Sequence, residues 1–411
     1  MGKILDRNDE RTLSYHLAAL FTVGAFFIEL FFNGKYLVCT PVLFLGYLFN
    51  YNPKFKGQIS KYLSIILIWL IFIFLQILIL GMIRTGNEDF FSFYYNLVLF
   101  ANLTMIFFMI GLTRLVNYLL KYLDLVVQYG VLLCTPVIFF KEIDIIQYRW
   151  RDFLNANSGY RLGVSSNINP NSIAWLYGFF AMLTLYFLLK SKKIRYVFLF
   201  VVELVCILFT GSKTGLLTAF IPVIFAFFKS LRKAKISNVI VILLVGFIFW
   251  YEVQNNPVLY TLIGNRLNSF LGLFGIGTVP VDAGSTLKRI HMIEFAENMI
   301  WEKPILGWGI GAFAQISGFG VYSHNNFIES LVSGGIVFST AYYFIYVLLS
   351  LQLFSLPKCE EKEVAILLIV SNLLIDFSTV TFYGQLLPYF KIIIIAMLLF
   401  YIQFIKERVE K

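Results

Sequence analysis

The sequence is poor in charge. Only 14% of its 411 residues are Asp, Glu, Lys or Arg, whereas 59% are hydrophobic and 18% are aromatic. An average soluble domain carries about 25% charged residues. A chain of this composition has too little polar material to cover a surface that faces water, and lipid removes that requirement. The composition therefore excludes an ordinary soluble domain and predicts an integral membrane protein.

Cysteine and histidine are also scarce. Cys39, Cys134 and Cys206 lie in apolar runs, Cys359 lies in a charged loop, and no CxxC or Cys/His cluster exists. This pattern predicts neither a disulfide nor a structural metal, and no cofactor is expected. The stretch GSKT lacks the spacing of a P-loop, and GWGIGAF lacks the βαβ unit of a dinucleotide site.

Long apolar runs are abundant, and they predict an all-α polytopic membrane protein with about twelve transmembrane helices. A spanning helix needs about 20 apolar residues. The seventh and eighth runs flank GSKTG at 211–215, which predicts a helical hairpin. The runs fall at 13–32, 36–50, 62–83, 92–112, 123–140, 171–189, 196–210, 216–228, 237–252, 327–350, 364–384 and 388–405.

The basic residues predict the orientation. If the N-terminus is cytoplasmic, 21 of the 33 Lys and Arg residues fall in inner segments, and the short outer loops carry only Lys35, Arg84 and Lys213. Cytoplasmic loops are enriched in such residues. Topology therefore explains the net charge of +10 without a nucleic-acid partner. The charged N-terminus lacks a cleavable signal site, so both termini are expected in the cytoplasm.

The chain is expected to form a single integral membrane domain over 1–411, with two long outer segments. One is the loop 141–170, and the other is the large outer loop 253–326 between the ninth and tenth helices. The second segment contains a predicted helix at 285–301, with Ser285 as its N-cap and Pro304 just beyond its end.

Several motifs occur together in the second half of the chain. RIHMIEFAENMIWEKPILGWGIGAF is followed by SHNNFIESLVSGGIVFSTAYY, and RLGVSSNINPNSIAWL and LFTGSKTGLLTAF come earlier. Together they resemble the O-antigen ligase and Wzy polymerase family: its C-terminal signature, its Arg-bearing outer loop and its Ser-Arg-Thr-Gly helix turn. The resemblance covers roughly 155–350, and the first 140 residues match by topology alone. Lys213 stands where the family more often has Arg, and Lys offers a point charge instead of a planar fork.

The resemblance implies a GT-C-like glycosyltransferase of the bacterial cytoplasmic (inner) membrane. Its donor would be a glycan on undecaprenyl pyrophosphate. The leading interpretation is a capsule or O-antigen repeat-unit polymerase, which transfers the growing glycan onto a lipid-linked repeat unit at the outer face. The alternatives are a ligase that uses another acceptor, and a polysaccharide flippase or transporter, for which internal repeats and paired broken helices would be expected. Implied partners are membrane lipid, a flippase and a chain-length regulator.

Three outer cations lie within the family-like motifs: Arg161, Lys213 and Arg289. The resemblance implies that they hold the pyrophosphate. Cations stabilise the charge that develops on a diphosphate leaving group, and each pair at about 4 Å is worth roughly 4 kcal/mol at an effective dielectric near 20. The alternative is that they only snorkel toward lipid phosphates.

Only three histidines exist, and His324 is the candidate catalytic residue, together with Arg289. A sugar hydroxyl needs a base, and the pKa of histidine lies near neutrality. Asn325 and Asn326 would orient His324 or bind sugar, although Asn325 could equally be a helix cap. His291 is the weaker candidate, and His16 lies on the inner side.

Carboxylates give weaker signals. Glu294 and Glu297 lie on the predicted outer helix, and Glu329 lies one turn into the tenth span. Asp376 falls within the eleventh run, where a charge costs roughly 3 kcal/mol. That cost predicts a structural partner, for which Lys391 is the candidate.

Overall fold

The structure is a computed structural model. It describes residues 119–143, 161–163, 170–212, 250–260, 283–357 and 360–382, together with single residues at 13–24, 42, 45, 68–80, 215–224, 244–248, 264, 268, 398 and 402. Within these residues the regular structure is helical throughout. Predicted sites at other positions, among them Lys213 and Lys391, lie outside the described residues.

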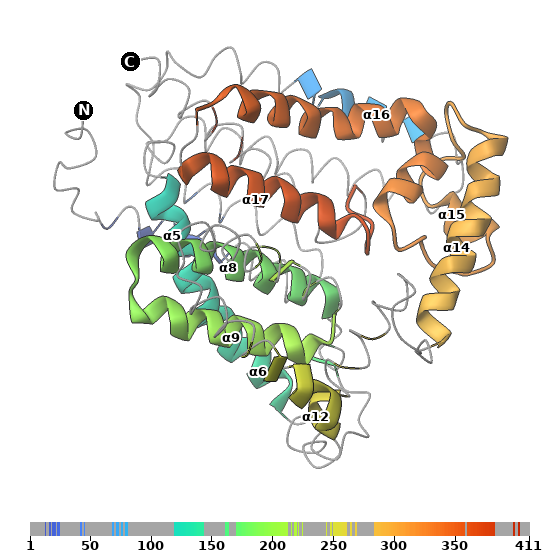
Figure 1. The fold of residues 1–411 in the computed structure, drawn as a ribbon. Coiled ribbons are helices and arrows are strands. Elements are labelled where there is room, and N and C mark those ends of the chain that lie inside the picture. Colours follow the sequence, from blue (N-terminus) through green and yellow to red (C-terminus); the bar gives the residue numbers. More distant parts are fainter. Residues whose placement is uncertain are drawn as a thin grey trace.

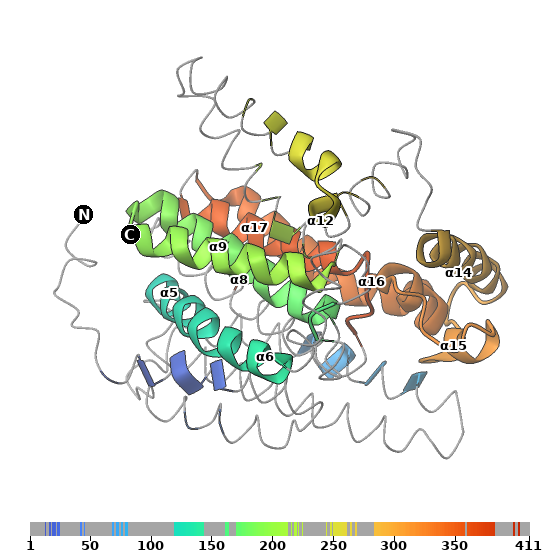
Figure 2. The ribbon, with the colours of Figure 1, turned by 90° about the horizontal axis from the view of Figure 1, so that it is seen from below.

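The long helices run side by side and alternate in direction (Figures 1 and 2). The first is a continuous rod in which a π-helical turn, η3, joins α5 to α6. The ends of the helices nearest residues 141, 170, 210, 326 and 375 lie at one end of the bundle, the end that carries α14 and α15. This alternation is what the predicted topology requires of these segments. The elements are α5 (Leu119–Tyr129), η3 (Gly130–Cys134), α6 (Thr135–Lys141), α8 (Pro170–Ser191), α9 (Ile194–Thr210), α16 (Asn326–Ser355) and α17 (Glu360–Ile375).

Three described helices are long and apolar enough to cross a membrane: Leu123–Lys141, Pro170–Ser191 and Asn326–Ser355. They coincide with the predicted runs at 123–140, 171–189 and 327–350, so the helical character of these segments is confirmed, and their length and composition are consistent with a membrane protein. The run at 196–210 likewise coincides with α9. Most of the other runs fall largely outside the described residues, and the count of twelve spans stays a prediction.

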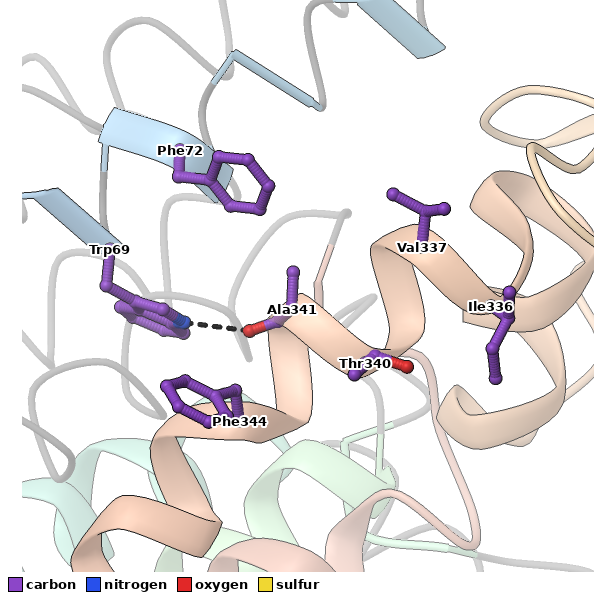
Figure 3. Close-up of a pocket in the computed structure, with 7 residues that line it drawn as sticks. All are labelled: Trp69, Phe72, Ile336, Val337, Thr340, Ala341 and Phe344. Carbon is purple, nitrogen blue, oxygen red and sulfur yellow. Dashed lines mark hydrogen bonds between the residues drawn. The ribbon is translucent and has the colours of Figure 1, made fainter.

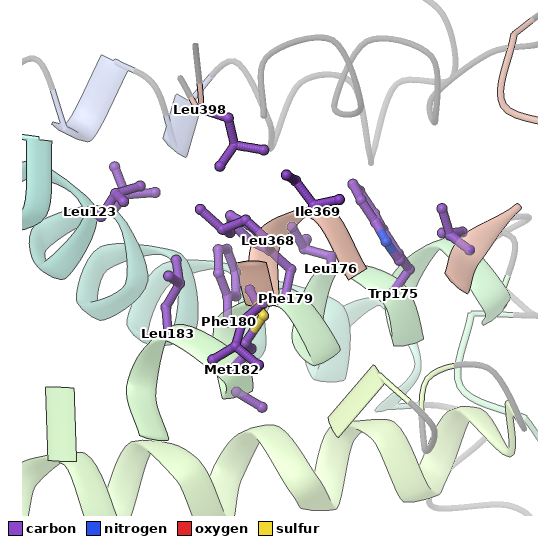
Figure 4. Close-up of a cluster of buried hydrophobic side chains, with 14 of the residues drawn as sticks. Leu123, Trp175, Leu176, Phe179, Phe180, Met182, Leu183, Leu368, Ile369 and Leu398 are labelled. Atoms are coloured by element: carbon purple, nitrogen blue, oxygen red, sulfur yellow. The ribbon is translucent and has the colours of Figure 1, made fainter. Parts of the chain in front are cut away.

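Helix α8 is the centre of the bundle. Every residue from 172 to 184 is buried, which is expected of a helix that is apolar on all faces. Its aromatic and aliphatic side chains meet Leu368 and Ile369 of α17 and Leu123 of α5 in one cluster (Figure 4). The core therefore joins α5, α8 and α17 in a single packed unit.

The hairpin predicted around 211–215 is confirmed for the described residues. Helix α9 ends at Thr210, where Gly211 takes the left-handed conformation (φ 57°) that commonly ends a helix. Helical residues resume at 215 and continue at described positions as far as 224. A Cβ on Gly215 would lie 2.5 Å from the Cβ of Ala174, so the second arm presses closely on α8.

Helix α14 (Ala283–Glu302) confirms the helix predicted at 285–301. Because it begins at Ala283, the assignment of Ser285 as N-cap is wrong. Together with the short helix α15 (Ala312–Ile316), α14 covers the start of α16 (Figure 1). A separate apolar cluster fastens the three helices through Met292, Ala296, Met299, Phe313 and Val332.

Two predicted boundaries are wrong. Helix α17 ends at Ile375, and described residues 376–382 form turns and irregular structure where an apolar run to 384 predicted continued helix. Helical structure at the ninth run also extends past 252 to 255 and is followed by α12 (Pro257–Leu259). In the first case side-chain contacts from α16, described below, replace the helical bonds of the apolar segment.

Candidate functional site

We call α14, α15 and the start of α16 the outer unit, after the outer loop predicted at 253–326. Helix α16 is broken where this unit meets the rest of the bundle. Gly335 has φ 61° and ψ −163°, which is not helical. The loop that follows α14 fills the break with its own backbone. Four hydrogen bonds join the two segments: Trp308 N to Val332 O (2.8 Å), Gly309 N to Ser333 O (2.8 Å), Ile336 N to Pro304 O (2.8 Å) and Val337 N to Ile305 O (3.3 Å). Backbone groups that the helix loses are thereby paired within the protein, as a membrane interior demands.

Glycine is required at this junction because backbone meets backbone. A Cβ on Gly335 would lie 2.2 Å from the carbonyl oxygen of Ile305, and one on Gly307 would lie 2.5 Å from the carbonyl carbon of Ser333. Both residues also have positive φ, at 61° and 68°. The glycines of GWGIGAF and VSGG, which carried part of the family resemblance, thus have a structural explanation.

His324 lies directly before α16 in the left-handed conformation, with φ 56°. Asn325 is the N-cap of the helix, and its Oδ1 accepts hydrogen bonds from the backbone of Phe327 (3.0 Å) and Ile328 (3.2 Å). The capping alternative for Asn325 is therefore confirmed. The cap fixes the direction of the chain on the helix side of His324.

Asn326 is fully buried and ties the segment after α17 to the start of α16. Its Oδ1 accepts from the backbone of Thr381 (2.6 Å) and Phe382 (3.2 Å), and its Nδ2 donates to the hydroxyl of Tyr343 (2.8 Å). Its backbone N–H donates to the carbonyl of Asp376 (2.7 Å). With its amide engaged inside the protein, we interpret Asn326 as a structural clamp.

Asp376 belongs to the same clamp. It lies in the turn after α17 and is fully buried. Its two carboxylate oxygens accept from the hydroxyls of Thr381 (2.7 Å) and Tyr343 (3.0 Å). A structural role was predicted for this carboxylate, and among the described residues it bonds the hydroxyls of Thr381 and Tyr343.

The structure brings Arg289 and His324 together across the contact between α14 and α16. Burial, followed by the positive charges of Arg289 and Lys288, lowers the pKa of His324 to about 4. The ring of Tyr322 lies 4.5 Å from that of His324, centroid to centroid. Burial lowers the pKa of Arg289, and the nearby Tyr322 opposes that effect. At neutral pH the site thus presents a neutral imidazole beside a guanidinium, which stays charged in proteins.

The imidazole is half-buried. Its Nδ1 is buried and makes no hydrogen bond to any of the described residues. A neutral ring beside cations can accept a proton, and an anion bound by those cations would make it a stronger base. The arrangement therefore suits transfer of a proton next to a bound anion.

Arg161 occupies a different part of the same end of the bundle. Its Nε donates to the carbonyl of Thr210 (2.8 Å), the last residue of α9, and its guanidinium also donates to Oδ1 of Asn171 (3.2 Å). A cation at a helix C-terminus complements the helix dipole. Arg161 thus borders the turn that follows α9, and Arg161 and Arg289 belong to different groups of helices.

The remaining candidates on α14 face outward. His291 Nδ1 pairs with Glu294 at 3.0 Å, and both side chains are about two-thirds exposed, at 64% and 65%. Glu297 is also exposed. Exposure and this local pairing fit the lower rank given to His291.

Lys288 and Tyr322 are members of the cluster that the sequence did not single out. Lys288 is exposed and precedes Arg289, so the basic pair itself was an available signal. Tyr322 precedes His324 by two residues, and an aromatic residue is too common in this chain to mark a site. Among the described residues no group of three His, Cys, Asp or Glu could hold a metal ion.

An apolar groove runs along α16 just beyond its break (Figure 3). Trp69 forms part of its wall and donates a hydrogen bond to the carbonyl of Ala341 at 2.9 Å. The groove has a volume of about 430 Å³ and is lined by Trp69, Phe72, Ile336, Val337, Thr340, Ala341 and Phe344. It suits a hydrocarbon chain better than a sugar.

Comparison with known families places these features in context. A family described as O-antigen ligase (Wzy_C) matches residues 196–343, a segment that includes α9, α14, α15 and the broken part of α16. Among curated proteins none matches the chain. The apolar helices and the family match together support a bacterial membrane protein. The match to residues 196–343 thus supports the O-antigen ligase family and a membrane enzyme that processes glycans.

Proposed function

We propose that this protein transfers a glycan from an isoprenoid diphosphate to a sugar hydroxyl at the outer face of the cytoplasmic membrane. The observation that carries the proposal is the meeting of Arg289 and His324, because it sets a cation beside a neutral base. Glycosyl transfer from a diphosphate needs both groups: one for the leaving group and one for the acceptor.

In the proposed reaction the acceptor oxygen attacks the anomeric carbon of the donor, and the bond from that carbon to the phosphate oxygen breaks. The isoprenoid diphosphate leaves with the bonding electrons, and Arg289 and Lys288 stabilise its charge. The hydroxyl proton passes to His324. No nucleotide or metal is needed in this scheme, because the donor is already activated.

Arg161 and Lys213 form the second part of the proposed diphosphate site. Arg161 is already bonded to the end of α9, so its guanidinium is held in place before substrate arrives. Held cations stabilise developing charge without reorganisation during the reaction. Asn325 caps the helix that presents His324, and we propose that it positions this histidine.

The apolar groove supports the lipid part of the proposal. The groove follows the membrane-spanning part of α16 away from His324. It begins at Ile336 and Val337, next to the loop that follows α14. An isoprenoid chain could lie along this side of the helix while its diphosphate stays at the outer end. Contacts with the sugars are expected beyond the diphosphate, on the side of His324 that faces away from the groove.

We propose the polymerase form first, in which the acceptor is another lipid-linked repeat unit. The ligase form is the second candidate, and the name of the matching family, O-antigen ligase, favours it. A transporter is less well supported, because the carbonyls of Val332 and Ser333 in the break of α16 already accept hydrogen bonds from the loop. Transporters use such carbonyls to coordinate ions near the midplane.

The deciding experiment combines purified protein with lipid-linked repeat units, without nucleotide or added metal. A ladder of longer lipid-linked glycans supports the polymerase. One transfer to a different acceptor, with no ladder, supports the ligase. Arg289→Ala and Arg161→Ala should each abolish or cripple transfer, as should Lys213→Ala, whereas Lys213→Arg should stay active. Normal transfer by all three alanine variants would refute the diphosphate site.

A further inference from the structure

Asn325 fixes the chain after His324, and a buried carboxylate, that of Glu329, holds Ser323, the residue before it. Oε2 of Glu329 accepts a hydrogen bond from the backbone N–H of Ser323 at 2.8 Å. Glu329 is fully buried, and Ser323 is 2% exposed. The hydroxyl of Ser323 in turn donates to the carbonyl of Asn325 at 3.0 Å. The chain is thus fixed immediately before and immediately after the histidine.

This fixation matters because His324 has an unfavourable backbone conformation. A residue with a Cβ pays roughly 1–2 kcal/mol in the left-handed region, which His324 occupies at φ 56°. Such a conformation persists only where the surroundings determine it, and it tends to occur at functional sites. Glu329 and the cap of Asn325 hold the chain on either side of His324.

The contact of Glu329 differs from ordinary helix capping. In a capping box, the acidic residue stands three positions after the N-cap and bonds the N-cap's own N–H. That position is Ile328 here, whereas Glu329 comes one residue later and bonds Ser323, two residues before the cap. The bond therefore spans His324 instead of closing the first turn of the helix.

We propose that Glu329 is a positioning residue for His324, one that holds the imidazole in place beside Arg289 by anchoring Ser323. The inference rests on the proposed function for its kinetic consequence, but the positioning itself can be measured without activity. Loss of the anchor should let His324 leave the left-handed conformation and move away from the cation.

The kinetic test compares Glu329→Ala and Glu329→Gln. Glu329→Ala should lower kcat by about 10²-fold, since a small misplacement of a catalytic group has effects of this size, while KM stays nearly constant because Arg289 is intact. Glu329→Gln keeps an oxygen that can accept from Ser323 and should retain most of the rate. Glu294→Ala, on the exposed face of α14, is the matched control and should behave as wild type.

A double variant separates positioning from general destabilisation. If Glu329 acts through His324, adding Glu329→Ala to His324→Ala should slow transfer no further. An equal further loss in that background, or a wild-type kcat in Glu329→Ala, would overturn the proposal.

A chemical readout distinguishes failure of this inference from failure of the proposed function. In the chain carrying His16→Gln and His291→Gln, His324 is the remaining histidine, so its carbethoxylation by diethyl pyrocarbonate can be followed by absorbance. Adding Glu329→Ala should raise the modification rate several-fold by releasing the buried ring, and Glu294→Ala should not. An unchanged modification rate overturns the positioning role even if the wild-type chain transfers glycan normally. A raised modification rate, together with a wild-type chain that transfers no glycan, would support the positioning role and reject the proposed function.

Discussion

The helix pair α8–α9 and the outer unit of α14 to α16 bury polar groups in different ways. Both must bury polar groups in a largely apolar chain. Within α8 and α9 the backbone is regular, and the left-handed residue Lys192 (φ 54°) lies in the exposed connection between them. The buried carboxyl group of Glu203 accepts a hydrogen bond from the hydroxyl of Thr184 at 2.7 Å. In the outer unit the helix itself is broken, and a loop supplies the missing bonds.

The difference indicates which part of the protein has unusual backbone conformations that could serve a functional site. A regular helix holds side chains in predictable directions but offers no unusual ones. The outer unit contains a left-handed histidine next to a cation, and positive-φ glycines at which backbone meets backbone. Strained groups of this kind are typical of functional sites. Variants can test whether the two regions really divide the work in this way.

The largest effect is expected from Gly335→Ala. The new Cβ would meet the carbonyl of Ile305 at 2.2 Å, and the loop would have to leave the break. We expect loss of folded protein, measured as the monodisperse fraction after detergent extraction. Gly320→Ala is the matched control: its φ is 68°, but no atom lies within 4 Å of a Cβ there. It should cost only about 1–2 kcal/mol from backbone strain, so equal damage by both variants would deny the close approach its importance.

His324→Ala should slow transfer by roughly 10²–10⁴-fold, the usual scale for general-base catalysis, while donor binding stays nearly intact. His324→Gln should restore little, because an amide cannot take the proton. Steady-state kinetics with lipid-linked donor and acceptor measure the transfer rate and the KM for the donor. His291→Ala, which removes an exposed ring paired with Glu294, should be mild. The reverse ranking would move the catalytic role onto α14.

In the helix pair α8–α9, Thr184→Val should reduce stability without reducing the intrinsic transfer rate. It leaves Oε1 of the buried Glu203 without its hydroxyl donor, a loss of about 1–3 kcal/mol. Thermal unfolding in detergent would record the change, and Thr184→Ser, which keeps the hydroxyl, should recover most of it. A transfer rate per folded molecule that falls as steeply as for His324→Ala would erase the functional contrast between the regions.

The smallest effect is expected in the pH profile. A base works only when unprotonated, so kcat/KM for the free enzyme should fall as pH drops through about 4, the pKa of His324, instead of through its ordinary value of 6.5. Lys288→Ala removes one of the positive charges that lower this pKa, so it should move the acid limb upward. Because Lys288 is exposed, solvent limits the shift. A limb that stays in place or moves down would refute the electrostatic coupling.

The sequence predicted the regular parts of this architecture well. Apolar length alone locates α8, α9 and the start of α16 within a few residues, because lipid and core both select the same side chains. The capping option at Asn325 and the helix at 285–301 also follow from local signals. Local signals located these helices, whose backbone bonds its own neighbours, although they misplaced the N-cap of α14 at Ser285.

Two features that the sequence did not predict share a physical cause. The break at Gly335 depends on bonds from residues 304–309, and the end of α17 at Ile375 depends on the amide of Asn326. Neither partner is near in sequence, and both affected segments are apolar, so periodicity continued through them. The cluster of Lys288 and Tyr322 around His324 likewise exists only once α14 lies on α16.

The order of the broken helix and its loop along the chain bears on how the protein is made. The loop 304–309 precedes the gap that it fills, so its backbone groups are already synthesised when Val332 to Val337 emerge. Helix α16 can therefore meet lipid with its gap already closed, without waiting for α17. Residues 310–331 join the two segments, so the four hydrogen bonds also fix the distance that this stretch must span.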